Sequence, residues 1–287
     1  MDVAPPQLAA LVAIADHGTF EAAARHLHVT PSAVSQRIRA LESALGRVVV
    51  LRTAPCRPTA DGEVLLRLAR QVQLLQDEVA DALELERATR VDLPVAVNAD
   101  SLATWFRAVV GAVAGWEDVA LRLNVEDQAY SAGLLRSGDV LGAVTSEPTA
   151  VQGCSVERLG VLRYLPAAAP AFADRWRHGR GPVWAAMPMV VFNEKDELQH
   201  EVLAARGLAA PPVVHRVPTS ADFAEAVRLG LGWGMIPEPQ LDDRLVPLGT
   251  RLRVDVPLHW QRWRLDSPVL DRLTDAVRRS ARRHLRP

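Results

Sequence analysis

The stretch VTPSAVSQRIRALESALG, Val29–Gly46, combines a helix start, an apolar stripe and a polar outer face. Thr30 can cap a helix, and Pro31 suits its first turn because the missing N–H would be unpaired there. Gly46 is typical of the position just past a helix end. Between these signals, four apolar residues recur at helical spacing: Val34, Ile38, Leu41 and Leu45. The pattern predicts a helix over 31–45 with one buried face.

The opposite face of this predicted helix carries short polar or basic side chains. At 100° per residue it presents Ser32, Ser35, Gln36 and Arg39, with Arg37 at its margin. On an isolated helix, contact with solvent would explain such a face. The segments on either side of the helix favour another interpretation.

A helical stripe over 8–14 and a short second helix in GTFEAAARHLHV, residues 18–29, precede this helix. Three consecutive alanines in the second helix allow close packing. A short helix, a tight turn and a capped helix with a polar face form the helix-turn-helix pattern. Downstream, RVVVLRTAPCRPTADG (47–62) predicts a strand over 48–51 and a Pro-containing loop flanked by Arg52 and Arg57. Such a hairpin, or wing, can contact phosphate beside a DNA groove.

The whole segment FEAAARHLHVTPSAVSQRIRALESALGRVVVLRT, Phe20–Thr53, resembles the winged helix-turn-helix of LysR-type transcriptional regulators. The resemblance implies a DNA-binding domain over 1–58, a linker and dimerisation helix over 59–89, and a two-lobed effector domain over 91–287. It also implies that the polar helix face reads bases in the major groove while the wing contacts phosphates. The DNA contacts expected on this basis are Thr30, Ser32, Ser35, Gln36, Arg37, Arg39, Arg52 and Arg57.

Length and composition agree with several folded units. A chain of 287 residues, 49% of them hydrophobic, is too long for one ordinary domain and has enough apolar residues for real cores. No stretch reaches the roughly 18 to 20 apolar residues of a membrane span, so we expect a cytoplasmic protein without membrane contact. Cys56 and Cys154 lack metal-ligand spacing, and we expect no metal, cofactor or disulfide. The net charge of -1 excludes a globally basic nucleic-acid binder but allows a local basic face.

Residues 59–89 contain no proline, and their only glycine lies near the start, at Gly62. Apolar residues alternate at spacings of three and four, which predicts a heptad seam. The expected seam residues are Leu65, Leu68, Val72, Leu75 and Val79. Such a helix can pack on its own chain or pair with a second subunit. Pairing is better motivated, because a dimer, or a tetramer built from dimers, matches a two-fold operator on double-stranded DNA.

From Val91 onward, short apolar strands alternate with helical patterns. Strands are predicted at 93–97, 119–125 and 140–144, with helices near 101–114 and 129–137. A second series of strands is predicted at 161–165, 189–192, 213–217 and 234–237. These series predict two α/β lobes like those of periplasmic binding proteins. Lobe I should span about 91–160 and 266–287, where a final helix returns to it as the family resemblance implies, and lobe II about 161–265.

Ligands of open α/β sheets bind beyond the carboxyl ends of the strands. The candidate effector-binding residues at these ends are Ser101, Thr104, Glu126, Asp127, Thr145, Asn193, Asp196, Ser220 and Asp222. They include many acids, opposed only by Lys195, so a ligand with both an anionic and a cationic group is favoured. We expect the ligand's carboxylate on the N–H groups and hydroxyl around Ser101–Thr104. The cation should lie among Glu126, Asp127, Asp196 and Asp222.

Three further strings sharpen the resemblance. NADSLATWF (98–106), VFNEKDELQ (191–199) and GWGMIPE (232–238) resemble the lysine- and arginine-responsive ArgP/LysG regulators of basic amino-acid export. The resemblance implies L-lysine or L-arginine as effector, an exporter gene as target, and double-stranded DNA, a second copy of the chain and RNA polymerase as partners.

Two other binding functions compete with this one. A LysR-type regulator of an aromatic or anionic metabolite would carry arginines and serines at the strand ends. A solute-binding protein would need no helix-turn-helix. No catalytic motif is found, because the chain has no P-loop and no GxSxG. The Gly-rich string GLGWGM (230–235) leads into a strand, whereas a nucleotide-binding loop joins a strand to a helix. We therefore expect no enzyme activity.

Overall fold

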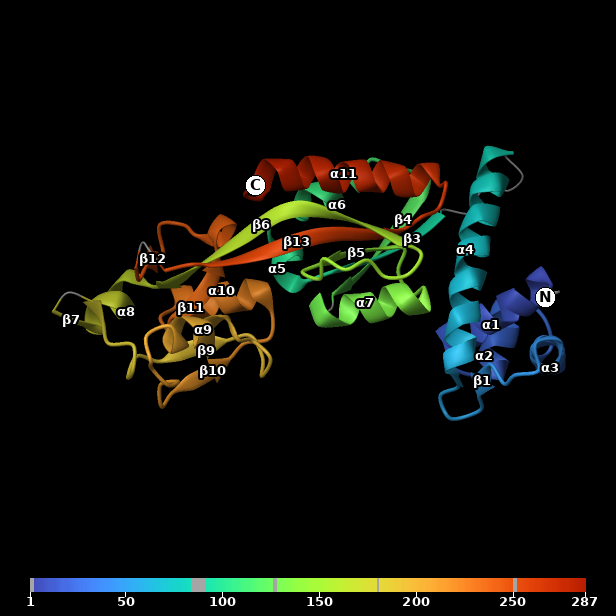
Figure 1. Ribbon diagram of the computed structural model, residues 1–287, viewed down its shortest axis with the longest axis horizontal. Helices are drawn as coiled ribbons and strands as arrows, with labels where there is room; N and C mark the ends of the chain where they lie inside the picture. Colours follow the sequence, from blue (N-terminus) through green and yellow to red (C-terminus); the bar gives the residue numbers. More distant parts are fainter. Residues whose placement is uncertain (1–2, 84–90, 126–127, 180, 250–251) are drawn as a thin grey trace.

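The computed structural model describes residues 3–83, 91–125, 128–179, 181–249 and 252–287. Figure 1 shows a small helical head, a long helix beside it and an elongated α/β region. The head and the long helix consist of α1 (Pro5–His17), α2 (Phe20–His26), α3 (Pro31–Leu45), the hairpin β1 (Val50–Leu51) with β2 (Arg57–Pro58), and α4 (Ala60–Ala82).

Local capping fixes the helices of the head. The Thr19 hydroxyl accepts from the backbone N–H of Ala22 at the start of α2, and Thr30 accepts from Ala33 at the start of α3. Gly46 ends α3 in the left-handed conformation at φ +65°, which glycine adopts without steric cost. The helix expected over 31–45 is therefore confirmed, and its apolar stripe lies in the buried core of the head.

One mixed sheet forms the centre of the α/β region. Its strands are β3 (Val91–Val97), β4 (Val119–Val125), β5 (Gly142–Thr145), β6 (Cys154–Ala168), β11 (Gly234–Pro237), β12 (Val246–Pro247) and β13 (Val254–Trp263). Their order is β11-β6-β13-β5-β3-β4, with β12 also paired to β6. In lobe I, β3 pairs in parallel with β4 and β5. The strands expected at 93–97, 119–125, 140–144 and 234–237 correspond to β3, β4, β5 and β11.

Two long antiparallel strands, β6 and β13, join the lobes (Figure 1). β13 lies beside β5 in lobe I through His259–Arg262, whereas the far end of β6 pairs with β11 in lobe II. The position 160/161, at which the sequence places a lobe boundary, lies inside β6. The strand expected at 161–165 is the middle of this longer strand.

Lobe II contains a second, two-stranded parallel sheet, the hairpin of β7 and β8, and short helices. Its remaining elements are α8 (Pro170–Arg175), β7 (Arg177–His178), β8 (Gly181–Pro182), β9 (Met189–Val191), α9 (Leu198–Ala204), β10 (Val214–Arg216), α10 (Ser220–Arg228) and the 3-10 turn η1 (Glu238–Gln240). In lobe I, the helix expected over 101–114 is split into α5 (Ala99–Ala103) and α6 (Arg107–Val113), followed by α7 (Gln128–Ser137).

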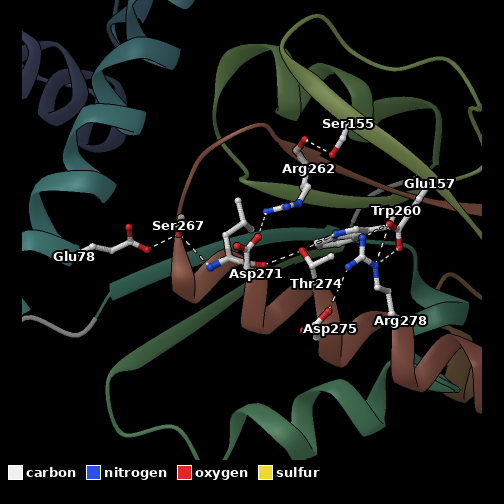
Figure 2. A network of polar contacts seen from close by, with 11 residues as sticks. Glu78, Ser155, Glu157, Trp260, Arg262, Ser267, Asp271, Thr274, Asp275 and Arg278 are labelled. Carbon is white, nitrogen blue, oxygen red and sulfur yellow. Dashed lines mark hydrogen bonds and ion pairs between the residues drawn. The ribbon is translucent and has the colours of Figure 1, made fainter. Parts of the chain in front are cut away.

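The last helix, α11 (Pro268–His284), lies along lobe I as expected. Its apolar face is buried, and the Ser280 hydroxyl donates to the carbonyl of Trp105 at 2.6 Å. Figure 2 shows the polar contacts along its length, where Trp260 Nε1 donates to Thr274 at 3.2 Å and Arg278 pairs with Glu157. The C-terminal helix therefore belongs to lobe I.

The long helix α4 has three differently occupied faces. One face packs into the core of the head through Leu65, Leu66, Ala69 and Val72. A second contacts lobe I: the Arg67 guanidinium lies 5.1 Å from the Trp263 ring centroid, Leu74 is buried in the lobe I core, and Glu78 accepts from Ser267 at the start of α11 (Figure 2). The third face is exposed and apolar at Val64, Leu75 and Val79, and the exposed Leu83 directly follows the helix.

Candidate DNA-binding face and inter-lobe cavity

The helix α3 lies on the side of the head away from the α/β region (Figure 1). Ser32, Gln36 and Arg39 are exposed there, and Ser35 and Arg37 are half-buried. Thr30 is exposed but its hydroxyl caps the helix. Together, the five residues from Ser32 to Arg39 on this face offer hydroxyl, amide and guanidinium groups, which are the groups that contact base edges and phosphates.

The wing adds two further cations beside this face. Arg52 and Arg57 are exposed on either side of the β1–β2 turn, and the Arg52 guanidinium lies 5.1 Å from the Phe20 ring centroid. Arg47 is held by Asp61 at 3.0 Å. Among the residues that the structure describes, no ion pair involves Arg37, Arg39, Arg52 or Arg57. These four guanidinium groups are therefore available to phosphates.

A cavity of about 450 Å³ lies between the two lobes. Residues at the ends of β3 and β4 form its lobe I wall, and the strands β6 and β13 contribute Tyr164 and Val256. The loop from Phe192 to Leu198 and residues of α10 and β11 form the lobe II wall. Its full lining is Asn98, Ala99, Asp100, Val125, Tyr164, Phe192, Asn193, Lys195, Asp196, Glu197, Leu198, Pro218, Phe223, Met235 and Val256.

The carboxyl of Asp100 in this lining is held by two side-chain hydrogen bonds. Tyr164, on the crossing strand β6, donates to its Oδ2 at 2.8 Å, and Ser220, in lobe II, donates to its Oδ1 at 2.6 Å. Burial raises the pKa of the Asp100 carboxyl, although these two hydrogen bonds oppose the shift. The carboxyl of Asp100 is therefore held between lobe I, a crossing strand and lobe II.

Asp196 faces the same cavity from lobe II. Its carboxylate accepts from the backbone N–H groups of Phe192 at 2.8 Å and Leu198 at 3.3 Å, which fixes the loop. Its charge also contributes to the raised pKa of Asp100, so the two carboxyls interact. Within the described part of the chain, no ion pair neutralises Asp100 or Asp196. A cation between the lobes would relieve this repulsion.

Asn98 lines the lobe I end of the cavity. Asn98 is only 7% exposed, and its Oδ1 has no hydrogen-bond partner in the described structure. A buried polar atom without a partner costs free energy, so a ligand that donates to it gains more than it would in water.

The sequence-predicted effector residues fall into three groups. Asn193 and Asp196 line the cavity, and Ser220 reaches it through Asp100 and also borders an adjoining hollow of about 570 Å³. Glu126 and Asp127 lie outside the described residues.

The other four candidates do not line the cavity. Ser101 is buried and its Oγ has no partner, and the Thr104 hydroxyl donates to the backbone carbonyl of Asp100. Thr145 is buried and accepts from the N–H of Glu147. Asp222 is exposed and accepts from Thr219 at the start of α10.

Sequence reasoning missed Asp100, Tyr164, Asn98 and Glu197. Asn98 and Asp100 come directly after β3, within NADSLATWF (98–106), and their position at a strand end is a usable signal. Tyr164 carried no such signal, because only the pairing of β6 with β11 and β13 places it beside Asp100. The structure thus has a carboxyl where the ligand's carboxylate was expected.

A helix-turn-helix head, a long connecting helix and a two-lobed cavity domain define a ligand-responsive DNA-binding regulator. Residues 6–63 match the bacterial regulatory helix-turn-helix protein model of the LysR family. The lysine export transcriptional regulatory protein LysG of Corynebacterium efficiens is 50% identical over 98% of this chain and 99% of its own. The chain belongs to the LysR family, in the group of the LysG and ArgP regulators.

Two solved structures share the whole architecture. Full-length LysG from Corynebacterium glutamicum, with bound effector Arg, has a TM-score of 0.83 and 45% identity over 99% of this chain and 100% of its own. ArgP from Mycobacterium tuberculosis has a TM-score of 0.86 and 46% identity, covering 98% of both chains. No described helix of the present chain is both long and apolar enough to cross a membrane.

Proposed function

We propose that this LysR-family regulator senses a basic amino acid, L-arginine or L-lysine, in the inter-lobe cavity and controls the gene of a basic amino-acid exporter. The supporting observation is the acidic lining: Asp100, Asp196 and Glu197 face a cavity in which Lys195 is the only lysine or arginine of the described lining. LysG with bound Arg, a close relative in sequence and fold, supports the same ligand class. An anionic metabolite would instead meet carboxyls that already repel one another.

The proposed regulator acts by binding, not by catalysis, and works in the cytoplasm. The outer face of α3 and the wing bind a dyad in double-stranded DNA, and the exposed apolar face of α4 pairs two subunits. Because lobe I and lobe II both line the cavity, a ligand that contacts both favours the closed arrangement. That preference can change how the paired heads are presented to DNA and RNA polymerase. The size of this change is limited by the difference between the ligand's affinities for the two arrangements.

Titration calorimetry on the full-length protein tests the ligand class. L-arginine and L-lysine should bind, whereas L-citrulline and L-norleucine, which keep the shape but lack the distal charge, should bind more weakly by roughly 2 to 5 kcal/mol. The penalty arises because the neutral analogues leave a partly buried carboxylate unpaired. Heats for arginine and lysine that match those of buffer would refute the proposal and leave a LysR-family regulator of another ligand.

A further inference from the structure

The cavity contains two separate acidic groups, one on each lobe. Asp100 belongs to lobe I and is enclosed, with both carboxylate oxygens already accepting hydrogen bonds. Asp196 and Glu197 belong to a lobe II loop, where Asp196 is half-buried and Glu197 is exposed. A ligand with one cationic group can neutralise only one of these sites. A basic amino acid has two cationic groups, its α-ammonium and its side-chain end.

The two acidic groups differ in how much variation in the ligand's cationic group they tolerate. Hydrogen bonds from Tyr164 and Ser220 fix the Asp100 carboxyl, and the buried Oδ1 of Asn98 has no hydrogen-bond partner in the described structure. A compact ammonium group, with three N–H donors, can satisfy Asp100 and Asn98 together. The more open Asp196–Glu197 pair can receive either a planar guanidinium or an ammonium group.

We propose that Asn98 and Asp100 bind the α-ammonium group of the effector, and that Asp196 and Glu197 bind its side-chain cation. This assignment rests on the proposed function. It places the group shared by arginine and lysine in the fixed subsite and the group that differs between them in the open one. It keeps the α-end of the ligand beside the end of β3, as expected from the sequence, but it gives the contact with Asp100 to the α-ammonium group, because that carboxyl would repel a carboxylate.

Paired variants and ligands test the orientation by calorimetry on the full-length protein. Asp100→Asn should weaken L-arginine by roughly 30-fold or more, because the α-ammonium loses its charged partner. The same variant should bind 5-guanidinopentanoate, which is arginine without the α-ammonium, about as the wild type does. Asp196→Asn should show the converse pattern: a similar loss for arginine and little change for L-citrulline.

Two further variants keep the result interpretable. Asn98→Ala removes an acceptor without changing charge and should weaken arginine about tenfold, but not 5-guanidinopentanoate. Glu194→Gln changes a carboxylate of the same loop that does not line the cavity, and should leave arginine binding unchanged. If Asp100→Asn weakens 5-guanidinopentanoate as much as arginine while sparing citrulline, the orientation is overturned. Absence of arginine and lysine binding to the wild type would instead refute the proposed function.

Discussion

Asp100 couples ligand binding to pH at the scale of a single residue. Burial raises the pKa of its carboxyl above the ordinary value, and the Asp196 charge adds to that shift. A cationic ligand binds the ionised form, so its affinity should be full above this raised pKa and fall as pH drops through it. Calorimetry with arginine over a series of falling pH values should show this decline, with a flatter profile for Asp100→Asn. Identical profiles for the two proteins would contradict the assignment.

The ligand-free protein should respond to pH in the opposite direction. Because the folded state binds the Asp100 proton more tightly than the unfolded state, this group stabilises the fold below its unfolded pKa. That contribution is lost as pH rises through the folded pKa. Asp100→Asn should therefore have a higher Tm than the ligand-free wild type at pH values above this folded pKa, and the difference should shrink on acidification. Thermal unfolding followed by circular dichroism at several pH values measures it.

The two thiols should differ sharply in reactivity. Burial raises the pKa of Cys154 to about 11, so roughly one molecule in a thousand carries its thiolate at pH 8. Cys56 is only half-buried and lies in the turn of the wing, directly before β2. A thiol reagent that yields a coloured product should label one cysteine per native chain and two per unfolded chain. Rapid labelling of both in the native protein would contradict the buried position of Cys154.

At the scale of elements, α3 and the wing should affect DNA binding in different ways. Gln36→Ala should relax the choice of sequence, with about 1 to 3 kcal/mol of discrimination lost if Gln36 contacts a base edge. Arg52→Ala should weaken all duplexes alike and flatten the log-log salt dependence by roughly 0.9 for the lost phosphate contact. Fluorescence anisotropy on dyad and scrambled duplexes at several salt concentrations separates the two. Unchanged binding by both variants would refute the proposed face.

The exposed face of α4 should determine assembly. Leu75 is 39% exposed and Val79 is 56% exposed in the single chain, so charging them leaves the head and lobe I packed. Leu75→Glu with Val79→Glu should give monomers by light scattering at micromolar concentration, because a paired interface would bury four unpaired charges. Gln73→Glu with Gln76→Glu adds the same charge elsewhere on α4 and should remain dimeric. A dimeric Leu75/Val79 variant would exclude this face as the interface.

Sequence patterns predicted these elements unequally, for physical reasons. The α3 stripe and its Thr30 and Gly46 signals are local, so they could be read from the chain directly. β13 was missed, although Val254, Val256, Leu258 and Trp260 alternate as in a strand; Pro257 weakens that signal, and a register shift follows it at Leu258/His259. The cavity joins residues from segments that lie far apart in the sequence, and only the tertiary fold brings them together. Asn193 and Asp196 were found because they follow a strand that could be recognised.

At the scale of the whole molecule, Arg70 joins three parts of the chain. From α4, its guanidinium pairs with Asp16 of the head at 2.6 Å and with Asp139 of lobe I. Both carboxylates are more than a third exposed, so each pair should contribute only about 0.2 to 1 kcal/mol to stability. The effect of Arg70→Ala should therefore be seen in the arrangement of the parts more than in the Tm.

Small-angle X-ray scattering tests this expectation. Arg70→Ala should raise the radius of gyration while the Tm changes by only a few degrees. Arg122→Ala, which removes an exposed ion pair to Asp92 within lobe I, is the matched control and should leave the scattering unchanged. A scattering curve for Arg70→Ala that superimposes on the wild-type curve would show that the ion pairs do not hold the head.

The two packed faces of α4 also limit how this protein can be rebuilt as a biosensor. A hybrid that joins this head to another regulator's effector domain inherits residues shaped for lobe I at Arg67, Arg70, Leu74 and Glu78. A crossover at the end of α4 would set those side chains against foreign surface, whereas a crossover before α4 would strip the head of Leu65 and Ala69. A working hybrid must therefore treat the faces of α4 separately. The helix keeps its own residues at the positions that contact the head, and takes the donor's residues at the positions that contact lobe I.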